Sequence, residues 1–217
     1  MVSKDDITIT GSCRITENRA FLNGEPYFSS AEKEAFPVFM KALYKKVGPG
    51  YPKFYKMDPL TKLGFISAEL LLTDNARTGL YPEQSRGIVL MNASASADVD
   101  RSFQKTIEDK EDYYPSPGLF VYTLPNIMAG EIAIRHKLKG ENTVFILPTF
   151  SMEFLIDYVD LLFETQKVTC CLAGWVEVDD KDYDSLLLIL EKGGKKKENA
   201  YKLPFTRDVL ENLYKPD

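Results

Sequence analysis

The sequence predicts an α/β fold in which apolar strands alternate with amphipathic helices. Two observations predict it: short β-rich apolar runs recur along the chain, and between them apolar residues recur at helical spacing. The expected strands are 7–11, 87–93, 143–147, the run that ends at Glu177, and 183–191. We therefore expect a mixed five-stranded sheet in β-α-β-α-β-α-β-β order, with helices on both faces, in a single domain over residues 1–217.

The composition excludes several classes of protein. A net charge of −5 gives no basic footprint for nucleic acid. No apolar run reaches about 18 residues and no basic, apolar leader is visible, so neither a membrane span nor a secretory signal is expected. The cysteines are Cys13, Cys170 and Cys171, an odd number whose adjacent pair points to opposite faces of a strand, which argues against a disulfide framework. We expect a protein of the reducing cytoplasm, with no cofactor and no metal site.

The first half of the chain contains two expected helices. One is expected over 29–47, with a late start or a kink because Pro37 lies within it. The other is expected over 60–71, because Asp58–Pro59 combines a capping side chain with proline at the first helical position. The segment 108–118 is charged and then rich in tyrosine and proline, which is typical of a loop that covers something.

The stretch 116–177 is the centre of the prediction. A helix over 124–138 is expected to end at Lys139–Gly140, a basic turn followed by glycine. The strand 143–147 must stop at Pro148, which cannot donate to a sheet ladder. Ser151 can then cap a helix, so a loop at the carboxyl end of a strand leads directly into a helix N-terminus. Enzymes often place a nucleophile at such a position.

Several short motifs recur in a fixed order along the chain. They are Met57–Asp58, Lys62–Leu63–Gly64, Ser116–Pro117, Asn126, Ala129–Gly130, Ile134–Arg135, Gly140, Asn142, Ala173–Gly174 and Glu177. In this order they resemble the β-ketoacyl-[acyl carrier protein] synthases, condensing enzymes of the thiolase fold, whose first strand the run 7–11 also resembles. The resemblance extends over most of the chain and implies one thiolase-like half, of the N-terminal type, because a full synthase is a tandem duplication of about twice this size.

The resemblance fails at the catalytic residues. The family's nucleophilic cysteine corresponds to Thr149, and the residue before it is Pro148 rather than alanine. A threonine hydroxyl without an activating base is a poor nucleophile, whereas a cysteine is partly ionised near neutral pH. The family also requires two histidines, and His136 is the single histidine of this chain. We therefore predict no catalytic residue, and a degenerate nucleophile loop that consists of Pro148, Thr149, Phe150 and Ser151.

The resemblance then implies one of two functions. The first is a non-catalytic partner of a full-length ketosynthase in fatty-acid or polyketide-type chain elongation, similar to the chain length factors of aryl-polyene and related polyketide pathways. The second is a self-associating protein that binds an acyl group or an acyl carrier protein and retains residual thioester chemistry at Thr149 or Ser151. The partner is accordingly a ketosynthase subunit or a second copy of this chain.

The strand 143–147 and the helix after it form the expected interface. The family pairs this strand across a two-fold axis, and nothing charged protects its apolar edge here, so the edge invites pairing. The helix is apolar around most of its circumference and therefore needs cover on more than one side. The interface residues are Thr143, Val144, Phe145, Ile146, Leu147, Phe154 and Tyr158.

Two groups of charged residues, one acidic and one basic, each have more than one interpretation. Glu153, Asp157, Asp160 and Glu164 form an acidic stripe on the helix, which would repel its own copy in a homodimer and favours a basic partner. A solvated surface explains this stripe better than a metal site does. Lys195, Lys196 and Lys197 are candidates for docking an acidic acyl carrier protein, and an ordinary solvated hairpin explains them equally well.

Overall fold

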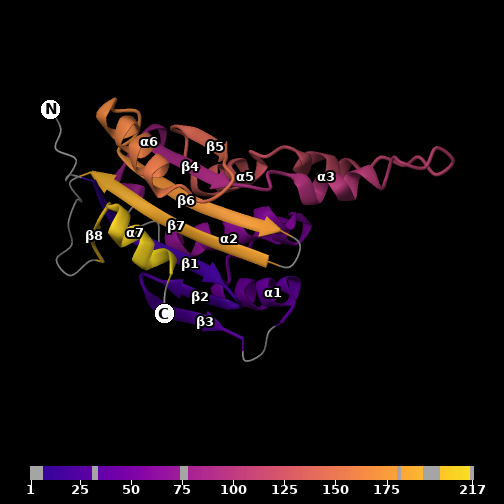
Figure 1. Cartoon of the computed structure of the whole chain (residues 1–217), viewed down its shortest axis with the longest axis horizontal. Coiled ribbons are helices and arrows are strands. Elements are labelled where there is room, and N and C mark those ends of the chain that lie inside the picture. Colours follow the sequence, from indigo (N-terminus) through magenta and orange to yellow (C-terminus); the bar gives the residue numbers. More distant parts are fainter. Residues whose placement is uncertain (1–6, 31–33, 74–77, 180–181, 193–200, 216–217) are drawn as a thin grey trace.

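The chain folds around one mixed sheet, and the computed structural model describes residues 7–30, 34–73, 78–179, 182–192 and 201–215 of it. In this part of the chain the sheet has eight strands: seven follow the order β3-β2-β1-β7-β6-β4-β5, and β8 pairs with β1 off this path (Figure 1). The strands are β1 (Ile7–Thr16), β2 (Arg19–Leu22), β3 (Glu25–Ser29), β4 (Arg86–Asn92), β5 (Asn142–Ile146), β6 (Cys170–Asp179), β7 (Asp182–Lys192) and β8 (Leu203–Pro204).

The five predicted strands are present and lie next to one another in the order β1-β7-β6-β4-β5. β4 lies between β5 and β6 and is parallel to both, whereas β7 is antiparallel to β6 and to β1. β5 is at one end of the strand order, and β7 runs antiparallel to both of its neighbours. The expected five-stranded sheet is nevertheless too small, because β2, β3 and β8 extend it. Asn23 and Gly24 have positive φ angles of 56° and 81° and turn β2 into β3, two short strands that the apolar pattern did not predict.

Helices cover both faces of the sheet, as predicted, and each face has its own apolar core. One core includes Leu43 of α1, Leu63 of α2 and Ile132 of α5, and the other includes Leu155 of α6 and Leu210 of α7. Cys170 and Cys171 lie in different cores because adjacent strand residues point to opposite faces. The α-helices are α1 (Phe36–Val47), α2 (Pro59–Leu72), α3 (Ala97–Gln104), α4 (Pro117–Phe120), α5 (Ile127–His136), α6 (Met152–Glu164) and α7 (Arg207–Tyr214), and the short 3₁₀ helices are η2 (Pro52–Lys56), η3 (Thr78–Leu80), η4 (Glu83–Ser85) and η5 (Val121–Thr123).

The helix boundaries follow local capping chemistry. Asp58 accepts hydrogen bonds from the backbone N–H groups of Leu60 and Thr61, at 3.0 and 3.3 Å, and so caps α2 as predicted. The helix predicted over 29–47 starts late, at Phe36, so that Pro37 falls in the first turn, where its missing N–H costs nothing.

The end of α5 differs from the prediction. The helix stops at His136 because Lys137 takes the left-handed conformation, with a φ of 55°, so Lys137 and not Gly140 terminates it. Gly140 instead serves a close backbone contact, since a Cβ there would lie 2.9 Å from the carbonyl oxygens of Gln84 and Arg86. Glycine is required at this position for space rather than for helix termination.

Residues 97–123, here called the arm, project from the body of the molecule (Figure 1). At the base of the arm, Val99 and Tyr122 are buried in the core that α2 and α5 share. Farther out, the rings of Phe103 and Phe120 pack with 5.5 Å between their centroids. Residues 108–115 are exposed. The prediction that this loop covers something is therefore wrong for the chain by itself.

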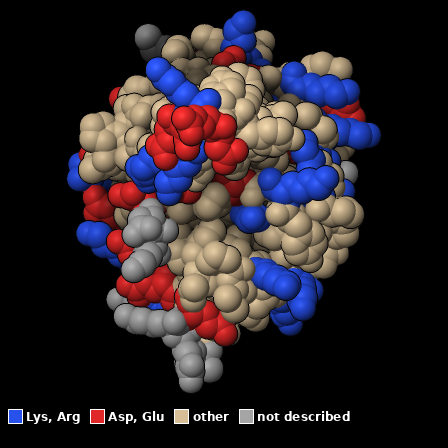
Figure 2. Space-filling model, turned by 90° about the vertical axis from the view of Figure 1, so that its right-hand side faces the viewer, with Lys and Arg blue, Asp and Glu red and all other residues tan. Residues whose placement is uncertain are grey.

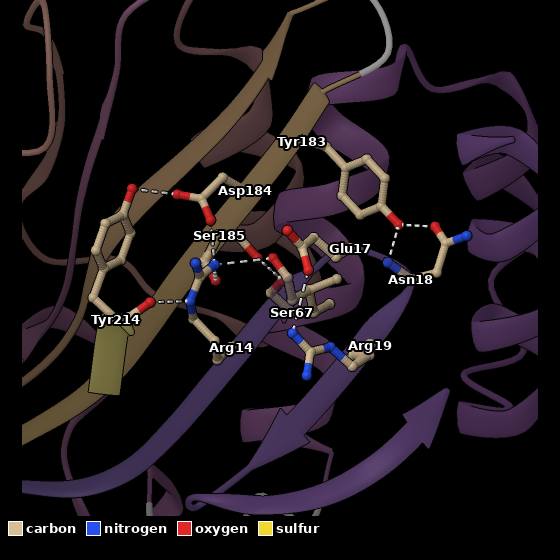
Figure 3. Close-up of polar contacts among 10 residues, drawn as sticks. Arg14, Glu17, Asn18, Arg19, Ser67, Tyr183, Asp184, Ser185 and Tyr214 are labelled. Atoms are coloured by element: carbon tan, nitrogen blue, oxygen red, sulfur yellow. Dashed lines mark hydrogen bonds and ion pairs between the residues drawn. The ribbon is translucent and has the colours of Figure 1, made fainter. Parts of the chain in front are cut away.

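The C-terminal helix α7 is tied to the sheet by a polar network (Figure 3). The Arg14 guanidinium, which is buried, donates to the carbonyl oxygens of Tyr214 and Ser185, at 2.8 and 3.1 Å, and forms an ion pair with Asp184. The Tyr214 hydroxyl donates to the other oxygen of Asp184, and the Arg14 guanidinium lies 4.6 Å from the centroid of the Tyr214 ring. Leu210 is buried in the second core and Tyr214 packs against it, so α7 of the same chain covers this core.

Candidate functional site: the strand-end loop and the open sheet edge

The loop after β5 presents the predicted nucleophile position to solvent. Thr149 and Pro148 are exposed, and the Ser151 hydroxyl accepts a bond from the Phe154 N–H at 3.4 Å as the cap of α6. Phe150 turns inward, where its ring stacks on Trp175 at 5.9 Å and meets the edge of Tyr214 at 5.2 Å. Ser151 therefore has the predicted structural role of a cap.

The neighbouring strand ends supply polar groups, and these are used to hold the backbone. The Glu177 carboxylate at the end of β6 accepts hydrogen bonds from the backbone N–H groups of Ala93 and Ser94 and from the Ser94 hydroxyl. Asn92 is fully buried and donates to the Ala95 carbonyl, 3.3 Å away, across a turn in which Ala95 has a positive φ of 50°. The sequence singled out Glu177 only through the resemblance. It did not predict that the Glu177 carboxylate fixes the turn after β4 by hydrogen bonds.

His136 lies at the other end of β5 from Thr149. Its ring is next to Glu69, with 2.9 Å between Nε2 and Oε1, and Arg135 binds the same carboxylate at 2.8 Å. The carboxyl group of Glu69 is almost fully buried, which opposes ionisation, but the hydrogen bonds and charges of His136 and Arg135 outweigh burial and hold its pKa below the ordinary value. Since about five strand residues at roughly 3.3 Å each separate the two ends, His136 cannot serve as a base for Thr149.

The three cysteines are buried and are poor nucleophiles. Burial raises the pKa of Cys13 and that of Cys171 to about 12, and it raises the pKa of Cys170 well above its ordinary value. Because the thiolate is the reactive form, these side chains behave as small apolar core residues. Among the residues that the structure describes, no group of three or more His, Cys, Asp or Glu side chains is placed to hold a metal ion.

β5 forms an open edge of the sheet. Among the described strands it pairs only with β4, from Asn142 to Ile146, so its other side carries unpaired backbone groups. Phe145 points to α6, and its ring centroid lies 4.8 Å from those of Phe154 and Tyr158. Thr143, Val144 and Leu147 are half-buried, and the Thr143 hydroxyl lies 3.4 Å from that of Tyr158. The structure thus brings Phe145 together with Phe154 and Tyr158, whereas Val144 packs against the core on the opposite face of the sheet.

Exposed apolar side chains flank this edge. The edge face, as we call it, consists of Ile134 on α5, Ile146 on β5, and Phe154 and Leu161 on α6, which are 74%, 46%, 37% and 51% exposed. Twelve large apolar side chains are exposed in the described residues, and all except Val38, Tyr55 and Leu80 lie between positions 113 and 161. Exposed apolar surface is therefore concentrated on the edge face and the arm.

The acidic stripe of α6 is partly neutralised within the chain. Glu153 forms an ion pair with Arg207 of α7, which also binds Glu211 at 2.7 Å. Asp157 and Glu164 are exposed. The candidate carrier-docking residues Lys195, Lys196 and Lys197 lie outside the described residues. None of the described helices is long and apolar enough to cross a membrane.

Comparison with known proteins identifies the fold. No family model and no curated protein matches the sequence. Among solved structures, the chain is similar to "The ishigamide ketosynthase/chain length factor", with a TM-score of 0.60, 19% identity, and coverage of 92% of this chain but 64% of that one. A β-ketoacyl synthase from Burkholderia phymatum STM815 gives a TM-score of 0.56, 16% identity, and coverage of 87% and 59%.

A third solved structure contains a chain that is matched over nearly its whole length, and over nearly the whole length of the present chain. It is a ketosynthase, ApeO, in complex with its chain length factor, ApeC, from Xenorhabdus doucetiae, with a TM-score of 0.54 and 12% identity. The match covers 96% of this chain and 90% of that chain. With the strand order and helix layers described above, these likenesses show that the chain has the thiolase-like fold of ketosynthases and chain length factors.

Proposed function

We propose that this chain is a non-catalytic ketosynthase-like subunit, comparable to a chain length factor, that pairs with a full-length ketosynthase in acyl chain elongation. The open edge of β5 carries the proposal. An unpaired apolar strand at a sheet edge is a template for a strand of another chain, and β5 is such a strand among the described residues.

The side chains around that edge support the same conclusion. Ile134, Ile146, Phe154 and Leu161 flank the strand from α5, β5 and α6 and are exposed, and exposed apolar side chains beside an unpaired strand favour a protein interface. Two of the structures that share the fold are described as pairs of a ketosynthase and a chain length factor. We propose that β5 pairs with the corresponding strand of the partner, so that the two sheets become continuous.

The state of the strand-end loop supports a non-catalytic role. Thr149 is exposed, the Glu177 carboxylate is occupied by the turn after β4, and His136 is bound to Glu69 at the opposite end of β5. A hydroxyl nucleophile needs an adjacent base, and none of these groups is in position to act as one. The alternative, residual thioester chemistry at Thr149 or Ser151 in a self-associating protein, gains no support from these contacts.

Charge favours a heterodimer over a homodimer. Asp157 and Glu164 are exposed on α6 beside the edge face, and two copies of this surface brought together would repel. A synthase with Lys or Arg opposite them would have no such cost. An acyl carrier protein remains a further proposed partner of the assembled pair.

The test is co-expression of the chain with each full-length ketosynthase of its native host, followed by light scattering of the purified species. We expect a stable 1:1 complex with one of them. Ile146→Asp should abolish it, because the substitution buries an unpaired charge at the new strand pairing. Glu25→Lys, on the exposed part of β3 at the opposite edge of the sheet, should leave the complex intact. A complex unaffected by Ile146→Asp, or no complex with any synthase, would refute the proposal.

A further inference from the structure

One stretch of this acidic chain is basic. Residues 36–57 contain five lysines and no arginine, aspartate or glutamate, so the segment has a net charge of +5. Since the whole chain has a net charge of −5, the remaining residues together carry −10. Figure 2 shows an uneven distribution of charge, with acidic side chains gathered at the front and lower left and basic ones on the right. The five lysines are all exposed and are Lys41, Lys45 and Lys46 on α1 and Lys53 and Lys56 on η2.

Packing between α1 and η2 makes these lysines part of one surface. The Tyr44 ring of α1 stacks on the Phe54 ring of η2, with 4.1 Å between the centroids, and the Tyr55 ring meets both of them edge-on. The Tyr51 N–H donates to the Tyr44 hydroxyl at 2.8 Å. The backbone that carries the lysines is therefore fixed before any partner binds, which lowers the entropic cost of binding.

Two exposed apolar side chains lie on the same surface. Val38 of α1 and Tyr55 of η2 are each 54% exposed, and Val38 shares a helix face with Lys41 and Lys45. Among the described residues, Val38 and Tyr55 are two of the three large apolar side chains that are exposed outside positions 113–161. The basic face, as we call this surface, consists of Val38, Lys41, Lys45, Lys46, Lys53, Tyr55 and Lys56.

Little of this positive charge is neutralised within the chain. Lys53 forms an ion pair with Glu131, whose side chain is almost fully buried. Within the part of the chain that the structure describes, the other four lysines form no ion pair. Four lysines are thus left to attract an anionic partner.

The basic face lies away from the proposed strand pairing. The rings of Phe39 in α1 and Phe28 in β3 lie 5.8 Å apart, and β3 and β5 are at opposite ends of the strand order. Figure 1 likewise shows α1 beside β2 and β3 and apart from β5. Binding at the basic face is therefore independent of the proposed function.

We propose that the basic face binds peripherally to the surface of a membrane that contains anionic phospholipids. A basic helix that also exposes apolar side chains is typical of segments that lie on a membrane. The lysines would meet the phosphate groups, and Val38 and Tyr55 would enter the boundary between headgroups and acyl chains, where tyrosine is favoured. Carboxylates of a protein partner would be matched better by arginine, whose planar fork binds them with two hydrogen bonds, and the segment 36–57 has no arginine.

The charge of the rest of the chain sets the orientation of this contact. The residues outside 36–57 carry a net charge of −10 and would be repelled by the same anionic surface, so attraction is strongest when the basic face points to the membrane. Each lysine near such a surface strengthens binding about fivefold. Four unpaired lysines therefore give reversible binding and not permanent anchoring.

Co-sedimentation of the purified chain with vesicles tests the proposal. One set of vesicles contains equal parts of phosphatidylglycerol and phosphatidylcholine, and the other contains phosphatidylcholine alone. We expect the chain to sediment with the first set and not with the second, and to be released as the salt concentration rises, because salt screens the attraction. Equal sedimentation with both sets, or with neither, would overturn the proposal.

Paired substitutions locate the contact. Lys41→Gln combined with Lys45→Gln should weaken binding to the anionic vesicles by about tenfold or more, because two charges of the basic face are lost. Lys110→Gln combined with Lys167→Gln is the matched control, since both lysines are exposed, lie outside the basic face and change the net charge equally. The control should bind like the parent chain, and circular dichroism checks that both variants are folded. Vesicle binding that the first pair leaves unchanged would contradict the proposal.

An acidic protein is the other class of partner that lysines attract. The parent chain and the variant with Lys41→Gln and Lys45→Gln are therefore also tested for binding to an immobilised acidic carrier protein. If these two lysines are required for binding the carrier while vesicles are not bound, the basic face is a protein docking site and the proposal is wrong. Neither result bears on the proposed function, which is tested by the effect of Ile146→Asp on the complex with a synthase.

Discussion

The ring of Phe150, in the loop after β5, meets the edge of the Tyr214 ring in α7, with 5.2 Å between the centroids and 61° between the planes. The loop that would hold a nucleophile in a ketosynthase is thereby packed against the C-terminal helix of the same chain. Tyr214 is fixed in turn by Asp184 and Arg14 (Figure 3). A change at Tyr214 should therefore affect both the stability of the fold and the position of the loop.

We expect Tyr214→Phe to lower the free energy of unfolding by about 1–3 kcal/mol, because it removes a hydrogen bond to the Asp184 carboxylate and keeps the ring. Tyr214→Ala should cost more, about 3–5 kcal/mol, since the ring contacts with Phe150 and Arg14 are also lost. Urea unfolding measures both. Trp175, the one tryptophan of the chain, stacks on Phe150, so its emission should shift in Tyr214→Ala and stay nearly unchanged in Tyr214→Phe. Equal emission shifts would show that the loop does not depend on the Tyr214 ring.

The ion pair between Glu69 and Arg135 predicts how the stability of the fold changes at acidic pH. The pKa of Glu69 is lowered in the folded state, so its contribution to stability is present above the ordinary glutamate pKa and is lost as the pH falls through the folded value. Glu69→Gln leaves the Arg135 guanidinium without its counter-charge and should cost about 3–5 kcal/mol at pH 7.

Urea unfolding at pH 7 and pH 3 measures this effect, and the difference between Glu69→Gln and the parent chain should shrink at pH 3. Glu25→Gln, at an exposed site, should match the parent chain at both pH values. A constant difference between Glu69→Gln and the parent chain would mean that Glu69 acts through packing and not through its charge.

Part of the fold could be predicted from the sequence, namely the apolar strands and the helix caps. The pattern of apolar runs predicted β1, β4, β5, β6 and β7 because each of these strands contains its own run of apolar residues, which the fold buries or packs on one face. The short strands β2 and β3 were missed because the runs 19–22 and 25–29 are mostly half-buried or exposed and contain proline and charge. Capping signals at Asp58 and Ser151 were local and were correctly predicted.

The polar partners at the candidate site were not predictable in the same way. Arg14 and Asp184 are 170 positions apart, and Ser94 and Glu177 are 83 apart, so only the folded sheet brings each pair together. The apolar run 143–147 predicted β5, whereas Thr149 was singled out only by the resemblance to the ketosynthases. Nothing in the sequence indicated that the loop 108–118 would project, because an exposed aromatic segment and a buried one have the same composition.

The tyrosine and cysteine side chains whose pKa is raised by burial predict how the stability of the fold changes at alkaline pH. Burial, with a smaller effect from the Glu131 and Asp58 charges, raises the pKa of Tyr122 to about 12, and burial raises the pKa of Tyr183 to about 12. A folded-state pKa above the unfolded value means that stability is fully present below the unfolded pKa, about 10 for tyrosine, and is lost as the pH rises toward 12.

The free energy of unfolding should therefore fall steadily above about pH 9–10, with Cys13 and Cys171 contributing from the lower end of that range. Tyr122→Phe removes one titrating group and should make the decline between pH 10 and pH 12 shallower. Tyr113→Phe, at an exposed site of the arm, is the matched control and should reproduce the parent slope. Equal slopes for all three proteins would show that Tyr122 does not contribute.

The last prediction concerns chemistry at Thr149. The purified chain should neither take an acyl group from a carrier-protein thioester nor condense malonyl units, because none of the described residues is in position to act as a base for the exposed Thr149 hydroxyl and the three thiols are buried. Intact-protein mass spectrometry after incubation with acetyl and malonyl carrier protein should show no added mass. A time-dependent adduct on Thr149 or Ser151 would contradict a non-catalytic role.

Thr149→Cys makes this test sharper, because it places at this position the nucleophilic sulfur of the ketosynthases that the sequence resembles, without adding their histidines. The new thiol should react with iodoacetamide at a rate similar to that of Glu25→Cys, another exposed position, since neither has a histidine beside it to stabilise the thiolate. It should also fail to accept an acyl group from the carrier. A much faster alkylation at position 149 would reveal an activating environment in the loop, and the absence of catalysis could then be attributed to the threonine alone.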